Sequence, residues 1–157
     1  MIKNILTLFL ITISTIVYAQ TETTLSWETK LNTAINKSVA ENKSMMLFFT
    51  GSDWCGWCMR LQREVFFKPE FKTWADKNVV LLELDFPRRT AQDPEITKQN
   101  RELAQIFQVK GYPTVWFVTP EISDSNKINL KKMGYQGYLA GGPTAWTNAA
   151  NKFLLNK

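Results

Sequence analysis

Two cysteines separated by two residues are the side chains of this sequence best suited to chemistry. Cys55 and Cys58 follow the apolar run Met45–Phe49 across a short polar turn, and Leu61 and Val65 continue a helical spacing after them. At a helix start, unpaired backbone N–H groups and the macrodipole stabilise a thiolate. We therefore expect Cys55 to act as a nucleophile. Cys58 lies about one turn later on the same face, where it can attack and resolve a mixed disulfide.

The rest of the composition narrows the chemistry of this pair. The 157 residues contain two cysteines and no histidine, which excludes Cys–His catalysis, a Ser–His–Asp triad and a His-ligated zinc site. A bridge that closes so short a loop gains little chain entropy and makes a poor structural staple. No recognisable nicotinamide or flavin motif is present, so no cofactor is expected. The pair is predicted to exchange disulfides with other molecules.

The N-terminal segment resembles a targeting sequence. Residues 1–4 are a short basic start, residues 5–17 are apolar, and residues 17–19 offer small side chains for cleavage. The apolar run is too short for a comfortable membrane span. We interpret residues 1–19 as a cleaved signal peptide and residues 20–157 as one exported domain; an uncleaved anchor is the alternative. Export places this domain outside the cytosol, and the periplasm is the expected compartment; disulfides form and persist there.

Net charge and chain length give no sign of a nucleic-acid partner or of a second domain. The formal net charge is +5, but the lysines are scattered and form no basic stripe of the kind that nucleic acid requires. The length suits one domain with a sizeable core. We expect a monomer that binds no nucleic acid.

Hydrophobic spacing predicts an alternating α/β chain. Apolar residues at every fourth position (Trp27, Leu31, Ile35 and Val39) predict a helix over residues 26–42. Continuous apolar runs predict buried strands. The further predicted strands are at 44–50, 79–86, 114–119 and 127–133. Further helices are predicted from the cysteines to about 67, at 70–77 and after Gly141. Another begins at Asp93-Pro94-Glu95, with Asp93 as the capping residue and Pro94 at the first position, and its inner face is Ile96, Leu103, Ile106 and Phe107. This order predicts an α/β fold with a central mixed sheet of about four strands and helices on both faces.

Two motifs on this framework resemble those of the thioredoxin superfamily. They are Trp54-Cys55-Gly56-Trp57-Cys58 after a strand and Gly111-Tyr112-Pro113-Thr114 before a later strand. The resemblance extends over essentially the whole of residues 20–157. It is greatest to exported thioredoxin-like proteins and to the thioredoxin-like domains of thiol:disulfide interchange proteins. It implies a thioredoxin-like fold, substrates with protein disulfides or thiols, and a membrane electron donor as redox partner.

The resemblance also implies roles for residues around the cysteines. Pro113 matches the family's cis-proline beside the active site, which leaves the Tyr112 backbone free to pair with an extended substrate. Trp54 matches the tryptophan that shields the sulfurs. Gly56 has no Cβ and permits close approach of another chain, and Trp57 faces outward in the motif. The alternatives are an ordinary trans proline and plain packing of the two tryptophans.

The sequence departs from the family pattern at two places. Phe49 occupies the position of the family's buried acid, so Glu83 or Asp85 on the neighbouring strand is the candidate substitute; the alternative is that both acids are simply solvated. Trp57 stands where reducing members often carry proline and strong oxidants histidine. The direction of electron flow is therefore open, and Gly56 favours reduction or isomerisation.

Two other classes of function compete with this reading. A soft-metal module would bind Cu(I) through Cys55, Cys58 and Met59, with Met45 and Met46 nearby. A redox-inert folding or binding module would keep only the fold, and the intact cysteine pair argues against it.

Overall fold

The structure is a computed structural model that describes residues 24–122 and 128–155, so the predicted signal peptide lies outside the described residues. A five-stranded sheet forms its centre, in the order β1-β3-β2-β4-β5. The strands are β1 (Trp27–Glu28), β2 (Ser44–Thr50), β3 (Val79–Asp85), β4 (Thr114–Ile122) and β5 (Ile128–Gln136). The fold class is as predicted, and the strand beyond the expected four is the short β1.

Strand directions bring several chain segments to one edge of the sheet. β2 runs parallel to β3, and β4 runs antiparallel to β2, with Thr114 beside Phe49. β5 is antiparallel to β4, with Gln136 beside Val115. The carboxyl ends of β2, β3 and β5 and the amino end of β4 therefore lie along the same edge. The segments that leave or enter these strands there carry both predicted motifs.

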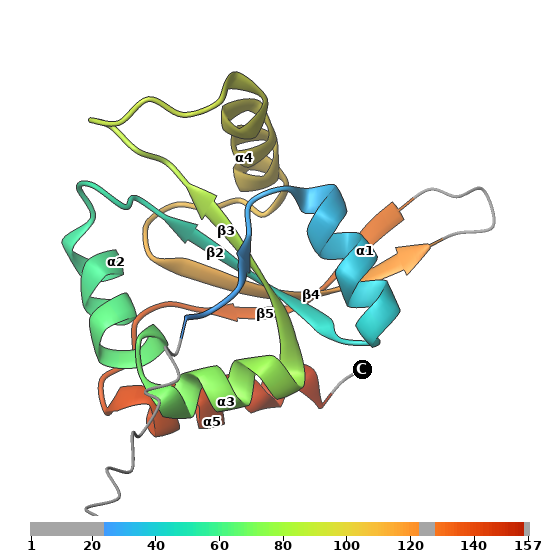
Figure 1. The fold of residues 1–157 in the computed structure, drawn as a ribbon, viewed down its shortest axis with the longest axis vertical. Coiled ribbons are helices and arrows are strands. Elements are labelled where there is room, and N and C mark those ends of the chain that lie inside the picture. The colour runs from blue at the N-terminus through green and yellow to red at the C-terminus, as the bar shows by residue number, and fades with distance from the viewer. Residues whose placement is uncertain (1–23, 123–127, 156–157) are drawn as a thin grey trace, which may run out of the picture.

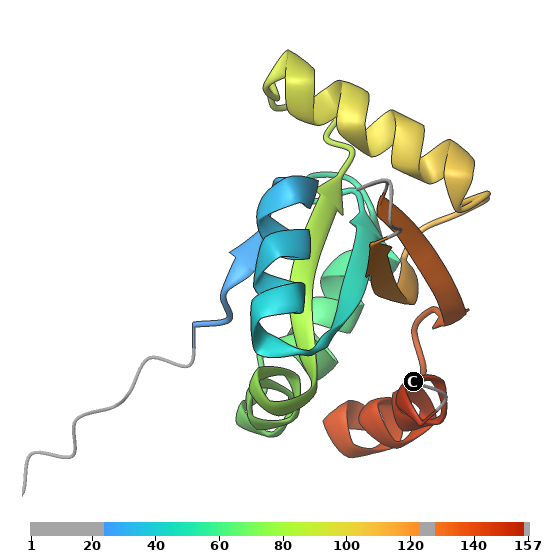
Figure 2. The same ribbon diagram turned by 90° about the vertical axis from the view of Figure 1, so that its right-hand side faces the viewer.

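Helices cover both faces of the sheet. They are α1 (Leu31–Glu41), α2 (Gly56–Leu61), the π-helical turn η1 (Gln62–Phe66), α3 (Pro69–Asn78), α4 (Pro94–Ile106) and α5 (Gly142–Leu154). Residues of α1 and α4 pack on one face of the sheet and residues of α3 and α5 on the other. Figures 1 and 2 both show α4 at the top of the molecule and α3 and α5 at its bottom. Asp93 caps α4 by accepting N–H groups from Glu95 and Ile96, as the sequence predicts.

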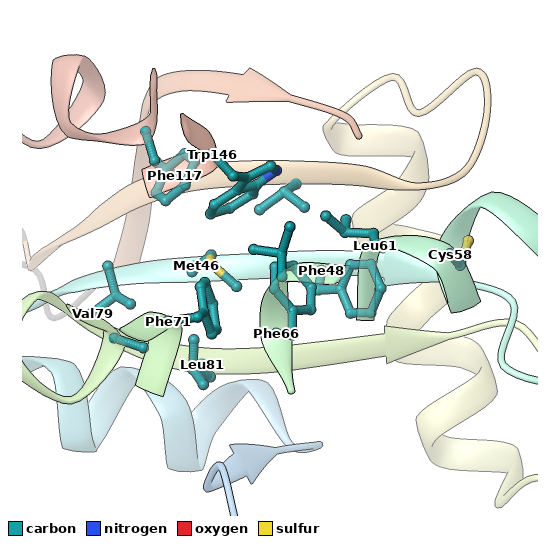
Figure 3. Close-up of a cluster of buried hydrophobic side chains, with 14 of the residues drawn as sticks. Met46, Phe48, Cys58, Leu61, Phe66, Phe71, Val79, Leu81, Phe117 and Trp146 are labelled. Carbon is teal, nitrogen blue, oxygen red and sulfur yellow. The ribbon is translucent and has the colours of Figure 1, made fainter. Parts of the chain in front are cut away.

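The apolar side chains form one cluster on each side of the sheet. Met45, Leu47 and Phe49 point toward α1 and α4, whereas Met46 and Phe48 point toward α2, α3 and α5. This alternation along a fully buried strand explains its unbroken apolar sequence. The second cluster is rich in aromatic rings around Phe66 and Trp146, and Cys58 lies at one end of it (Figure 3).

The predicted helix over residues 26–42 is wrong at its start and in part of its inner face. Trp27 lies in β1, where it pairs with Leu81 and packs on Phe48 and Phe66. Lys30 is extended, and the helix begins only at Leu31. Each four-residue step advances about 40° beyond a full helical turn, so the stripe drifts and Val39 is 49% exposed.

One inward assignment in α4 is also wrong. Ile106 is 57% exposed, whereas Leu103 and Phe107, one turn apart, are buried. The helix ends at Ile106, so that residue lies on the outer side of the final turn. Within residues 24–122 and 128–155, no helix has the length and apolarity needed to cross a membrane.

Candidate active site

The cysteines lie where β2 passes into α2, at the sheet edge where the loops converge. Cys55 is the N-cap of α2, with extended backbone angles, and its N–H donates to the Gly51 carbonyl at 2.9 Å. The Cys55 sulfur accepts the N–H of Cys58 at 3.2 Å. This position places Cys55 Sγ at the unpaired N–H groups of the first turn, which are the donors that stabilise a thiolate.

Cys55 and Cys58 are joined as a disulfide with a Cα–Cα distance of 5.2 Å. Cys58 is fully buried and Cys55 is 5% exposed. Both contact the aromatic cluster below the sheet. The structure is thus the oxidised state of the pair, with the less buried sulfur on the outer side.

Trp54 is fixed beside the disulfide by contacts from several segments. Its Nε1 donates to the Phe86 carbonyl at 2.8 Å, and its ring meets that of Tyr112 edge-on at 5.6 Å. The ring also lies against Gly51, where a Cβ would come within 2.4 Å of Trp54 Cε2. Glycine at position 51 is therefore required by the packing of Trp54.

The second motif lies next to this tryptophan. The Tyr112–Pro113 peptide bond is cis, as the resemblance implies. Thr114 pairs with Phe49 at the end of β2, which places Pro113 at the same edge as the cysteine turn. The Pro113 carbonyl oxygen also approaches Gly137, at 3.3 Å from where a Cβ would be. The structure thus brings Tyr112 and Pro113 together with Trp54.

Trp57 forms an exposed platform on the other side of the pair. Its side chain is 56% exposed and packs on Tyr138 at 5.4 Å and on the Arg60 guanidinium at 5.3 Å. Glu64 accepts hydrogen bonds from Tyr138 Oη at 2.5 Å and Arg60 Nε at 2.8 Å, and these two bonds lower the pKa of the Glu64 carboxyl. Gly56, at the start of α2, has open space where a Cβ would project.

The two acids proposed to replace the family's buried acid differ in their surroundings. Asp85 accepts hydrogen bonds from Ser52 N–H at 2.8 Å and Ser52 Oγ at 2.6 Å, so it anchors the cysteine turn. Along β3, successive side chains point to opposite faces of the sheet, so Glu83 lies on the same face as Leu81 and on the opposite face from Leu84. Leu81 belongs to the cluster that contains the cysteines, and Leu84 belongs to the other cluster. Burial raises the pKa of Glu83, and the negative charge of Asp85 adds to this effect.

The copper-binding alternative loses two of its ligands in this arrangement. Met45 and Met46 are fully buried on opposite sides of β2, where they fill the two apolar clusters. Of the other three candidate ligands, the Met59 side chain is 43% exposed, and Cys55 and Cys58 are bonded to each other in this oxidised state.

Sequence reasoning missed the contact between the turn before the cysteines and the loop that follows β3. Asp53, in the turn before the cysteines, accepts the backbone N–H groups of Arg88 at 3.0 Å, Arg89 at 2.7 Å and Thr90 at 3.1 Å. These bonds, led by that from Arg88, lower the pKa of the Asp53 carboxyl. The sequence shows only an acid within a turn, and this pattern does not indicate which distant backbone groups the acid binds. Tyr138 was also missed, because its contacts with Trp57 and Glu64 join residues that are far apart in the sequence.

A cysteine pair at the start of a helix, beside a cis-proline loop and on a mixed sheet covered on both faces, defines a thioredoxin-like thiol–disulfide oxidoreductase. A model of the Thioredoxin-like family matches residues 26–120. The chain belongs to this family.

Individual proteins agree with this class. The chain is 33% identical over 130 residues to disulfide bond reductase DsbH of Chlamydia pneumoniae, across 83% of this chain and 73% of that protein. It is 28% identical over 102 residues to the thioredoxin-related protein DsbJ of the same organism, across 65% of this chain and 29% of that protein.

Solved structures place the fold in the same class. A structure of the DsbH oxidoreductase superposes with a TM-score of 0.71 at 32% identity, over 85% of this chain and 86% of that one. A thioredoxin from Thermus thermophilus superposes with a TM-score of 0.59 at 16% identity, over 82% and 85% of the two chains, and shows the fold alone.

Proposed function

We propose that this protein is an extracytoplasmic oxidoreductase that reduces or isomerises disulfides of other proteins through Cys55 and Cys58. The observation that carries the proposal is the bonded pair at the mouth of α2, with Cys55 as N-cap and Cys58 buried behind it. The relative named as a disulfide bond reductase supports reduction as the direction. Gly56 favours the same direction through the family resemblance.

The reaction has two exchange steps. The Cys55 thiolate attacks one sulfur of the substrate disulfide, forms a mixed disulfide and releases the other substrate sulfur as a thiolate. The Cys58 thiolate then attacks the Cys55 sulfur, releases the second substrate thiolate and leaves the Cys55–Cys58 disulfide. Two electrons pass to the substrate. A membrane electron donor supplies two electrons to restore the dithiol.

The surrounding residues have separate roles in this proposal. Trp54 covers one side of the pair, and open space at Gly56 admits the substrate chain. The Tyr112 backbone, before the cis bond to Pro113, pairs with an extended substrate segment. Trp57 offers an exposed aromatic contact. Glu83 is the better candidate for a proton carrier to the pair, because the Asp85 oxygens bind the cysteine turn.

Export follows from the predicted signal peptide over residues 1–19. We expect the mature monomer to begin at Gln20, which N-terminal sequencing of the exported protein tests. A mature protein that retains Met1 would instead support the anchored alternative.

Insulin reduction with dithiothreitol tests the activity. The mature protein should accelerate the reaction, and both Cys55→Ser and Cys58→Ser should lose turnover. Full turnover by Cys55→Ser would contradict the assigned nucleophile. The reduction potential of the pair tests the direction, since a value near about −270 mV is that of a reductant and one near about −120 mV that of an oxidant.

A further inference from the structure

Arg88 is an exposed residue that the proposed mechanism does not use, yet its backbone is held firmly at the active-site edge. It belongs to the segment after β3, and its N–H donates to Asp53 at 3.0 Å. Arg89 and Thr90 donate to the same carboxylate. Asp53 precedes Trp54 in the turn that leads to Cys55. Three consecutive backbone N–H groups, including that of Arg88, therefore hold this segment against the cysteine turn.

The Arg88 side chain lies over the wall of the active site. Its guanidinium carbon is 3.6 Å from the centre of the Trp54 ring, a cation–π contact. The positive charge also reaches Tyr112, because it opposes the increase in the pKa of the Tyr112 hydroxyl that burial causes. Trp54 and Tyr112 contact each other edge-on at 5.6 Å. The guanidinium thus lies beside both aromatic residues that the proposed substrate path contacts.

This guanidinium keeps its hydrogen-bond donors available. Among residues 24–122 and 128–155, Arg88 forms no ion pair, and its guanidinium donates no hydrogen bond. The nearby carboxylates are engaged elsewhere: Asp53 with three backbone N–H groups and Asp85 with Ser52. On the other side of the pair, Arg60 is neutralised by Glu64 at 2.8 Å. Within the described residues, Arg88 is therefore a cation that stacks on the wall of the active site and keeps its donors free.

We propose that Arg88 is a specificity-determining residue that favours polypeptide disulfides flanked by a carboxylate side chain. This inference rests on the proposed function, since it concerns the substrate of the same cysteine pair. A guanidinium presents a planar fork of donors that matches a carboxylate, and stacking on Trp54 holds that fork in place before the substrate arrives. An aspartate or glutamate beside the substrate cysteine would accept these donors while Cys55 attacks.

Matched peptides test this preference. Two synthetic peptides share one intramolecular disulfide and differ only in the flanking residue, which is glutamate in one and lysine in the other. The wild-type protein should reduce the glutamate peptide with a kcat/KM about two- to fivefold higher, the range expected for an exposed ion pair. The preference should fall as salt is raised, because exposed charges are screened.

Two variants separate the side chain from net charge. Arg88→Gln should equalise the two peptides. Arg89→Gln makes the same change of charge one residue away and keeps the backbone bond to Asp53, and the Arg89 side chain stacks on no ring in the described residues, so this variant should keep the preference. The pKa of the Cys55 thiol, measured by thiolate absorbance, should be the same in both variants.

Several results would overturn the inference. A preference that survives in Arg88→Gln, or that falls equally in both variants, would show that Arg88 does not read the flanking residue. Equal slowing of both peptides with a changed Cys55 pKa would show that Arg88 acts on the thiolate instead. A wild-type protein that reduces neither peptide would contradict the proposed function itself, and this inference with it.

Discussion

Replacing Gly51 with alanine should destabilise the oxidised protein by about 2 kcal/mol. The added Cβ would lie 2.4 Å from Trp54 Cε2, so the indole must move. Movement costs the Trp54–Phe86 hydrogen bond, worth about 1 kcal/mol, and the Arg88 contact, worth about 0.5–1 kcal/mol. Overpacking adds to this loss. Alanine also lowers the conformational entropy of the unfolded chain, which offsets about 0.4–1 kcal/mol.

Urea denaturation of the oxidised protein measures this effect. With a slope of about 2 kcal/mol per molar, the midpoint should fall by about 1 M. Gly56→Ala is the matched control, because its Cβ would meet no atom within 4 Å and it begins a helix. Its midpoint should stay level or rise slightly. A Gly51→Ala midpoint equal to that of Gly56→Ala would refute the packing argument.

Three further substitutions have distinct expected outcomes. Glu83→Gln removes a carboxyl whose pKa is raised by burial and by the charge of Asp85. The wild-type protein loses stability as pH rises through this raised pKa, because the buried carboxyl must ionise, whereas glutamine does not titrate. The unfolding free energy of the variant minus that of the wild type should therefore be larger at pH 8 than at pH 4, and an equal difference at both pH values would contradict the burial of a raised-pKa carboxyl. Thr50→Val replaces a buried hydroxyl that has no hydrogen-bond partner in the described residues. The free energy of unfolding, measured by urea denaturation, should rise by about 1 kcal/mol, and a clear fall would show that the hydroxyl does have a partner. Trp57→Ala removes a side chain that is 56% exposed but packs on Tyr138 and Arg60, so the unfolding free energy should fall by about 1 kcal/mol while the KM for insulin rises, and an unchanged KM would remove Trp57 from the binding surface.

The parts of the fold that the sequence predicted are those set by local pattern. β2 was predicted with its observed bounds, 44–50, because both of its faces are buried and its apolar residues are continuous. The start of α4 was predicted because Asp93 and Pro94 carry their own capping chemistry. β1 was missed because two residues become a strand only by pairing with Leu81 and Leu82 of β3.

The candidate site divides in the same way. The cysteine pair and the Tyr112–Pro113 loop are motifs in the sequence, and the resemblance to the thioredoxin superfamily implied that they lie together; the pairing of Thr114 with Phe49 brings them to the same edge of the sheet. The Asp53 contacts with residues 88–90 join segments more than thirty positions apart. Such a pairing depends on two loops that meet only because β2 and β3 are parallel. No spacing rule within one segment encodes it.

The trapped mixed disulfide is the measurement that tests the central claim most directly. Cys58→Ser leaves Cys55 at the mouth of α2 and removes the resolving thiol, so an adduct with a disulfide-containing peptide should accumulate. Mass spectrometry of the digested adduct should find the peptide on Cys55. Cys55→Ser should form little adduct under the same conditions, because Cys58 is fully buried. An adduct on Cys58 in Cys55→Ser, with none on Cys55 in Cys58→Ser, would contradict the account.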